Sequence, residues 1–302
     1  MIRSITVESL SNGQSLKLIL ASPEMSQGFA VINCNGLGPG QAKVNDSDWV
    51  TIDGSSINSA RLPARDINID LRFVPTAYDE SVADIRRKSY VYFPIKKMVR
   101  LTFEFQDFKA RSTIRKRWIE GIVAKNETGP WSEEEGCSIQ IRCGDPYFRD
   151  VNVEEDSFSL ITPLFHFEFP DEVLDHPWPV SSVEELSEKI AINTSTINVG
   201  AIFTLEATAA VKNPYIFNRT TSQGFGLDYT LNPGEVLIID TRRGHKRVYV
   251  KDGRDTSKLG YLAVNSKWIE FVPGENTIGY LCDSNPESLH VSYMIEPVYE
   301  GI

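Results

Sequence analysis

The sequence predicts a mainly β protein with two domains and one short helix, and three observations support this. Apolar and polar residues alternate with period two through most of the 302 residues, which is the pattern of half-buried strands. In the second half such runs recur about every ten residues, separated by Gly, Asn and Pro, as in an antiparallel sandwich. The strand–helix alternation that builds a parallel βαβ sheet is not found.

In the first half, six alternating runs are predicted as strands, at residues 4–10, 15–21, 29–37, 67–73, 98–108 and 137–143. The GLGPG stretch, Gly36 to Gly40, is the densest in glycine. It has neither the Lys-Ser/Thr pair of a Walker loop nor a following helix to face a pyrophosphate. It is therefore predicted to be a turn between strands, followed by a polar loop at residues 45–56.

One segment of the first half breaks the strand pattern and predicts a helix at residues 80–90. Asp79 is the expected N-cap, and acidic residues early with basic residues late suit the helix dipole. Pro94 forces an end by the residue before it. The helix is expected to pack on a sheet through Val82, Ile85 and Tyr90.

After Asp150 the composition changes, with four prolines and an acidic bias over residues 151–189. The predicted organisation is a first domain at 1–155, a connector at 156–190 and a second domain at 191–302. Within the connector, Ser182 and Glu185 have the spacing of a capping box and predict a short helix. Strand alternation returns from Ile190 and continues through the second domain.

Charge and cysteine content limit the function classes. The chain has 31 Lys and Arg against 41 Asp and Glu, a net charge of −10, which argues against coating nucleic acid or an anionic membrane. With no signal-peptide pattern and no membrane-length apolar run, we expect the chain to fold in a cytosol with its four cysteines reduced. The cysteines and the four scattered histidines lack metal spacing, so no metal or cofactor is expected.

The remaining polar clusters do not predict catalysis, and no catalytic residue is assigned. Cys143 and Asp145 lie close together in IQIRCGDPYF, but without an adjacent base they are read as a structural corner. The acidic runs at residues 131–137 and 151–156 are read as solvated, although paired carboxylates could serve a glycosidase or a calcium site. The basic run at residues 241–247 is read as an exposed hairpin turn that keeps an edge soluble or meets an acidic partner.

Taken in order, the motifs resemble those of the distal tail proteins of long-tailed, non-contractile bacteriophages. In the first half the resemblance rests on four features: the GLGPG turn, the arginine-bearing strand within residues 59–73, the single helix, and strand MVRLTFEF followed by RWIEGIVAKNE. The closing IQIRCGDPYF is the most specific motif. In the second half it rests on INTSTINVGAIFTLEA, VKNPYIFNRTT, LNPGEVLIIDTRRGHKRVYV and KWIEFVPGENTI.

This resemblance implies a structural protein and not an enzyme. Family members form a hexameric ring from the N-terminal domain, a β-barrel or sandwich with one helix, and carry a galectin-like β-sandwich outside it. The implied partners are other copies of the chain, the tail-tube protein, the tail-tip or tail-associated protein, and receptor-binding or other baseplate proteins. DNA would only pass through the lumen, and no membrane is involved. The implied location is the virion tail tip, assembled in the bacterial host cytoplasm. No catalytic, cofactor-binding, metal or partner-binding residues are carried over.

Two other functions stay open on the sequence. A carbohydrate-binding module of a phage tail tip would use exposed aromatic residues such as Trp178 or Trp268. Galectins use a His-Asn-Pro-Arg set, however, and this chain repeats only Asn213-Pro214 of it. A glycosidase built on the acidic run at 131–137 would need an acid–base pair that the sequence does not place. Oligomeric state separates the first reading from these two.

Overall fold

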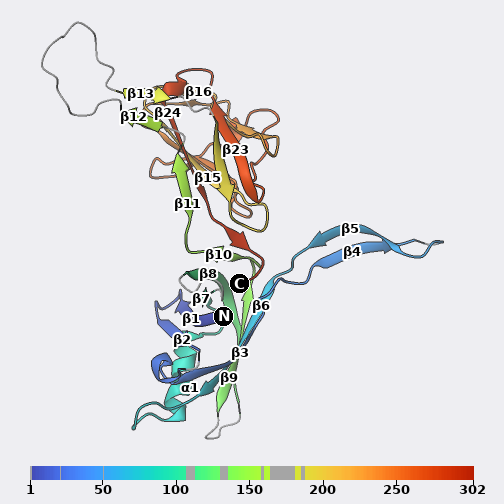
Figure 1. The fold of residues 1–302 in the computed structure, drawn as a ribbon, viewed down its shortest axis with the longest axis vertical. Coiled ribbons are helices and arrows are strands. Elements are labelled where there is room, and N and C mark those ends of the chain that lie inside the picture. Colours follow the sequence, from blue (N-terminus) through green and yellow to red (C-terminus); the bar gives the residue numbers. More distant parts are fainter. Residues whose placement is uncertain are drawn as a thin grey trace, which may run out of the picture. The chain divides into compact units, whose positions relative to one another are not determined.

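The structure is a computed structural model that describes residues 2–20, 22–49, 51–106, 113–129, 135–157, 160–163, 181–184 and 188–302. It contains two compact units (Figure 1). The first unit is Met1–Val151 with Val298–Ile302, and the second unit is Asn152–Pro297. The sequence pattern assigns the last five residues to the second domain. In the structure they return to the first unit, because strand β25 pairs there with β10.

The first unit is built on one nine-stranded antiparallel sheet of path β2-β1-β7-β8-β9-β6-β3, with β10 pairing both β8 and β25. The sheet does not close into a barrel over the described residues, since β2 and β3 end its path. The elements of this unit outside the arm described below are β1 (Ile2–Ser9), β2 (Ser15–Ile19), η1 (Glu24–Ser26), β3 (Phe29–Asn35), β6 (Arg65–Phe73), α1 (Val82–Tyr92), β7 (Met98–Gln106), β8 (Ile114–Thr128), β9 (Gly136–Cys143), β10 (Phe148–Asp150) and β25 (Val298–Tyr299).

Strand β8 is the longest and joins the two halves of this sheet. It pairs with β7 from Ile114 to Ile122 and with β9 from Ile122 onward, with a register shift after Val123. At Gly121 an added Cβ would lie 2.7 Å from Ile141 Cγ2, so only glycine lets the neighbouring strand approach this closely. The sequence pattern does not count this segment among the strands, because basic residues and this glycine interrupt its alternation.

The core of the first unit follows from the alternation that predicts its strands. Every second residue of β6 and β9 is buried, and β1 and β7 follow the same alternation except near one end. Their apolar faces form one cluster. Phenylalanines from distant strands meet edge to face in it. Phe29 lies 5.9 Å from Phe73, and Phe103 lies 5.8 Å from Phe148, between ring centroids. Such pairs add to the stabilisation from burial alone.

Helix α1 lies at residues 82–92 and not at 80–90, and its N-cap is Ser81 and not Asp79. Ser81 and Asp84 form a complete capping box, which satisfies the amides of the first turn. The buried face contains Ile85, as expected, but Tyr90 is 46% exposed. Five residues after Ile85, Tyr90 points about 140° away around the helix.

The second unit is an antiparallel β protein, as predicted. Its larger sheet has order β11-β24-β15-β20-β21-β22, and a second has order β14-β23-β17-β18. Alternate side chains of both sheets are buried. The strands are β11 (Glu154–Ser157), β12 (Leu160–Pro163), β13 (Ser181–Glu184), β14 (Glu188–Asn193), β15 (Ala201–Ala207), β16 (Val211–Lys212), β17 (Tyr215–Asn218), β18 (Gln223–Gly226), β19 (Thr230–Leu231), β20 (Val236–Asp240), β21 (Arg247–Val250), β22 (Thr256–Ser257), β23 (Gly274–Leu281) and β24 (Leu289–Ile295), with η2 at Leu259–Tyr261 and η3 at Pro286–Ser288.

Part of the predicted connector belongs to the sheets of the second unit. Strand β11 pairs with β24, and strands β12 and β13 pair with each other. The helix predicted from Ser182 is therefore wrong at residues 181–184, which form strand β13, and Glu185 lies outside the described residues. A four-residue capping pattern is a local signal, and strand pairing overrides it here.

Candidate functional site

The first unit carries a hairpin, called here the arm, at residues 43–61. Its strands β4 (Lys43–Asp48) and β5 (Ser55–Arg61) pair with each other and with no other strand of the described residues. The arm projects away from the main sheet in Figure 1. All of β4, and all of β5 after Ser55, is exposed. The predicted polar loop is therefore wrong where these two strands form.

The arm has one sequence signal that identifies it as a hairpin. Asp53-Gly54 is a dipeptide that favours hairpin turns, and Gly54 has a φ of +112°, a conformation that glycine adopts readily. The amide of Trp49 donates to the carbonyl of Gly54 at 3.4 Å. Hydrophobic alternation does not reveal the arm, because both of its faces meet solvent.

Large apolar side chains along the arm are exposed, at 48% for Val44, 53% for Trp49, 67% for Ile52 and 70% for Ile57. A two-stranded ribbon that buries little of its own surface is marginally stable by itself. Clustered exposed apolar side chains mark interaction sites in soluble proteins. The arm is thus the first candidate for a partner-binding element.

Two arginines hold residues 298–302 in the first unit. The Arg65 guanidinium donates to the carbonyl oxygens of Gly36, Gly38 and Glu300, and Arg117 donates to the carbonyl of Gly301. The Cζ atom of Arg117 also lies 3.5 Å from the centroid of the Tyr299 ring. Burial lowers the pKa of both guanidiniums. We call this arrangement the C-terminal clamp.

The clamp explains the GLGPG stretch as a structural turn. Two of its carbonyls accept hydrogen bonds from Arg65, and Leu37 accepts one from the amide of Ile302 at 3.1 Å. Gly36 has a φ of +88°, and a Cβ there would lie 2.2 Å from the carbonyl oxygen of Asp66. The loop therefore presents carbonyls to an arginine, whereas a phosphate site would need amides.

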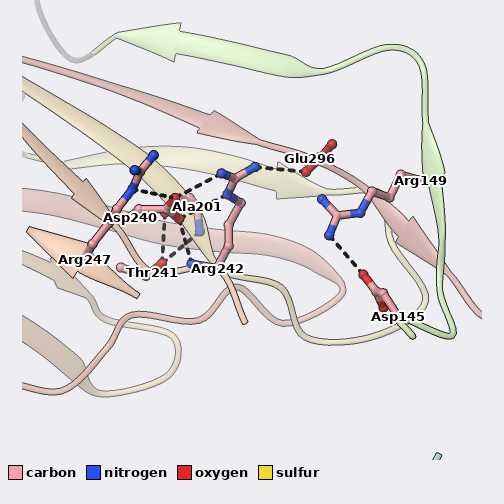
Figure 2. Close-up of polar contacts among 8 residues, drawn as sticks. All are labelled: Asp145, Arg149, Ala201, Asp240, Thr241, Arg242, Arg247 and Glu296. Atoms are coloured by element: carbon pink, nitrogen blue, oxygen red, sulfur yellow. Dashed lines mark hydrogen bonds and ion pairs between the residues drawn. The ribbon is translucent and has the colours of Figure 1, made fainter. Parts of the chain in front are cut away.

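The Cys143–Phe148 corner has the chemistry of a turn. Burial raises the pKa of the Cys143 thiol to about 12, so the thiol is protonated near neutral pH and is a poor nucleophile. Asp145 accepts from the amide of Tyr147 at 3.3 Å. It also accepts from Arg149 Nη2 at 2.9 Å (Figure 2). Phe148 then anchors the start of β10 in the core. These contacts fix the path of the chain where the main body of the first unit ends.

The acidic run at 131–137 contains a buried ion pair and is not wholly solvated. Glu135 is 0% exposed and binds Arg86 of α1 through both carboxylate oxygens. The hydrogen bonds that Arg86 donates to Glu135 raise the pKa of Arg86. The reading of this run as solvated is wrong for Glu135, whereas Glu133 and Glu134 lie outside the described residues.

Part of the basic run at 241–247 also turns inward. Arg242 binds both carboxylate oxygens of the fully buried Asp240 at 3.0 Å, and its Nη1 lies 3.1 Å from Glu296 Oε2 (Figure 2). The hydrogen bonds that Arg242 donates to Asp240 raise the pKa of Arg242. Thr241 exchanges hydrogen bonds with the backbone of Ala201, which ties β20 to β15. Of the remaining run, Arg243 and Lys246 are exposed, as expected of a hairpin turn.

Three buried asparagines organise the turns of the second unit. Asn193 donates to the carbonyl of Phe271 at 2.9 Å, and Asn218 donates to that of Glu270 at 2.9 Å. Asn276 accepts from the amide of Val272 and donates to its carbonyl, which closes the turn before β23. The asparagines of the sequence motifs at 192–207, 211–221 and 267–278 therefore have structural roles.

The other candidates of the sequence do not converge. Trp268 is partly buried against Phe225, at 4.8 Å between ring centroids, with Lys246 Nζ at 5.7 Å from its ring. Trp178, His166 and His176 lie outside the described residues. No group of three or more His, Cys, Asp or Glu side chains in the described part of the chain is placed to share a metal ion. Within that same part, no helix has the length and apolarity needed to cross a membrane.

A charged cluster on the main sheet has a pH-dependent consequence. Glu104 accepts from Lys116 at 2.9 Å, Ser4 at 2.8 Å and Lys17 at 3.1 Å. These contacts, led by Lys116, lower the pKa of Glu104 from 4.5 to about 2. A lowered folded-state pKa means that the carboxylate stabilises the fold fully above pH 4.5, and that this is lost as the pH falls through 2.

We therefore expect Glu104→Gln to lower the free energy of unfolding at pH 7 by about 1–2 kcal/mol. This loss of free energy is smaller than the full shift in the pKa of Glu104 would give. Both lysine side chains are 49% exposed, and water therefore screens their charges. Urea unfolding at several pH values measures it, and the difference from the parent chain should shrink between pH 4.5 and 2. A difference that does not change with pH would contradict this account.

Comparison with known proteins adds to this geometry. The family model of the siphovirus-type tail component, C-terminal domain, matches residues 194–295. No curated protein sequence matches the chain. Among solved structures, the chain is similar to Dit (gp 19.1) of SPP1, described as a paradigm of the hub adsorption apparatus in phages infecting Gram-positive hosts. The TM-score is 0.64 at 14% identity, with coverage of 97% of this chain and 98% of that one.

Two further similarities are to the phage p2 baseplate in its activated conformation, with Sr (TM-score 0.47) and with Ca (TM-score 0.46). Both are at 9% identity and cover 98% and 97% of this chain, and 98% of the compared chain. The family match includes Asn218 and Asn276 and begins one residue after Asn193, and the SPP1 similarity extends over nearly the whole chain. Residues 194–295 thus match the model of the siphovirus-type tail component, C-terminal domain, and the chain shares the fold of SPP1 Dit over nearly its whole length.

Proposed function

We propose that this protein is a structural component of a phage tail tip that assembles as a closed hexameric ring. The ring joins the tail-tube protein to the tail-tip and baseplate proteins and serves as the hub for host-adsorption proteins. DNA passes through its lumen, and the chain has no enzymatic role. The site of action is the virion, after assembly in the host cytoplasm.

The observation that carries this proposal is the exposed arm. A head-to-tail ring needs two complementary faces on every copy, one that reaches out and one that receives. The arm is a reaching element of this kind, with large apolar side chains left uncovered. The family match at 194–295 and the fold shared with SPP1 Dit support the tail-tip assignment.

The test is the mass of the assembly in solution. Native mass spectrometry of the full chain at high concentration is expected to show a six-copy species. A variant with residues 43–61 replaced by a short Gly-Ser linker is expected to remain monomeric. Circular dichroism and a cooperative thermal transition should show that this variant is folded, because the arm strands pair only with each other among the described residues. A parent chain that stays monomeric, or an arm-less variant that still forms rings, would contradict the proposal.

A carbohydrate-binding role is the second candidate, and one observation favours it. Tyr215 lies across two glycines of β18, so that a Cβ at Gly224 would fall 1.7 Å from its hydroxyl oxygen. Its ring stacks with Phe217 and is 38% exposed, as a sugar-stacking aromatic would be. This function does not require a closed ring, so a monomer that is unaffected by removal of the arm would favour it.

A further inference from the structure

The end of the arm is acidic as well as apolar. Asp46 and Asp48 precede the exposed Trp49, and Asp53 follows the exposed Ile52, whereas Lys43 and Arg61 pair in register at the base of the arm. In the described residues none of the three aspartates forms an ion pair, and Asp46 accepts only from Ser55 Oγ. We call Asp46, Asp48, Trp49, Ile52 and Asp53 the arm tip. Tryptophan is enriched among the residues that anchor interfaces.

A second exposed surface lies where α1 ends and β7 begins. Five apolar residues on it are 39–51% exposed, and we call them the helix-end patch: Leu10, Val91, Ile95, Met98 and Ile122. Strand pairing and hydrogen bonds bring four of them near one another, and Ile95 lies three residues before Met98 in the chain. The amide of Leu10 donates to the carbonyl of Met98 at 3.1 Å, Met98 and Ile122 are cross-strand partners, and Asn12 Nδ2 donates to the carbonyl of Val91 at 3.1 Å.

Two lysines project from the turn in the middle of this patch. Lys96 has a φ of +65°, which is unusual for a side chain of its size, and its amide donates to the carbonyl of Val123 at 2.9 Å. Lys97 follows and accepts from the amide of Val123 at 3.1 Å. Both side chains are exposed, and neither forms an ion pair among the described residues. The helix-end patch is therefore apolar with a positive centre.

We propose that the arm tip of one copy docks on the helix-end patch of the next copy in the ring, an inference that rests on the proposed function. The two surfaces are complementary: three unpaired aspartates face two unpaired lysines, and exposed apolar side chains lie beside both. Within one chain both surfaces are exposed, so neither covers the other. In a head-to-tail ring each copy gives one surface and receives the other.

Charge reversal tests this pairing. Asp48→Lys with Asp53→Lys (the tip variant) and Lys96→Asp with Lys97→Asp (the patch variant) should each weaken association at least about 100-fold, because like charges then meet. Aspartate is tolerated at a positive φ, so the patch variant should keep its turn. Circular dichroism and thermal unfolding verify that each variant is folded. Reversing Lys251 and Lys267 in the second unit is the charge-matched control, and it should leave assembly unchanged.

Mixing gives the decisive result. The tip and patch variants, combined in equal amounts, should form rings in which the two kinds of copy alternate, as six positions allow. A single chain carrying all four changes should also assemble. If the patch variant assembles normally while the arm-less variant does not, the docking is overturned and the ring proposal stands. If the unaltered chain never assembles, the ring proposal itself fails.

Discussion

Deleting residues 298–302 is expected to lower the free energy of unfolding of the first unit by about 4 kcal/mol. The deletion removes the carbonyl acceptors that Glu300 offers to Arg65 and Gly301 offers to Arg117. Hydrogen bonds to charged groups contribute about 1.5–3 kcal/mol each. The Nε atoms of both arginines are already buried without a partner, so each guanidinium has few other ways to be satisfied.

Denaturant unfolding of the full chain and of the deletion variant measures this effect. The second unit gives an internal reference, since the deletion removes none of its residues. Glu300→Ala is the matched control, because Arg65 donates to the backbone carbonyl of Glu300 and the substitution keeps that carbonyl. This substitution should lower the free energy of unfolding by well under 1 kcal/mol. Tyr299→Ala should fall between the two, since it removes the ring beside Arg117 and keeps the carbonyls. An unfolding midpoint that the deletion leaves unchanged would rule out the clamp.

The strands that bury one face were predictable from the sequence. Alternation matches burial residue by residue in β6 and β9, and in β1 and β7 except near one end, because a sheet with one buried face imposes period two. The arm was not predictable in this way, because neither of its faces is buried in the single chain. The Asp53-Gly54 dipeptide is the one sequence signal that predicts the arm. Such a dipeptide predicts a turn but not the surface that the hairpin contacts.

The C-terminal clamp depends on sequence separations that a local pattern does not contain. Arg65 lies 235 residues before Glu300, and Arg117 lies 184 residues before Gly301. Their meeting depends on β25 pairing with β10 after the whole second unit has intervened. Likewise the three motif asparagines were recognisable as a pattern, but their role in closing turns became clear only from their buried hydrogen bonds.

The Arg86–Glu135 pair shows that the face of a helix on which a residue lies determines whether its charge is buried or exposed. The sequence offers Arg86, Arg87 and Lys88 in succession, and helical geometry turns only Arg86 toward the core beside Ile85 and Ser89. Arg87 instead meets Asp84 at 3.2 Å on the exposed side. Residue type alone predicts three solvated cations, and the period of the helix explains why one is not.

Breaking this buried pair is expected to be costly. Glu135→Ala should lower the free energy of unfolding of the first unit by about 3 kcal/mol, because the buried Arg86 then loses both hydrogen bonds to the Glu135 carboxylate. Calorimetry and denaturant unfolding measure this loss. Arg87→Ala, on the same helix, is the matched control and should cost well under 1 kcal/mol, because the Arg87 side chain is 77% exposed.

Replacing both partners separates the cost of an unpaired charge from the value of the pair. Arg86→Met with Glu135→Leu removes both charges and fills similar volume, so stability should return to within about 1–2 kcal/mol of the parent chain. Recovery would mean that the pair fixes the position of α1 on the sheet more than it adds stability. A double variant as unstable as Glu135→Ala would instead show that the ion pair itself stabilises the unit, which would contradict the expected cost of burying two charges.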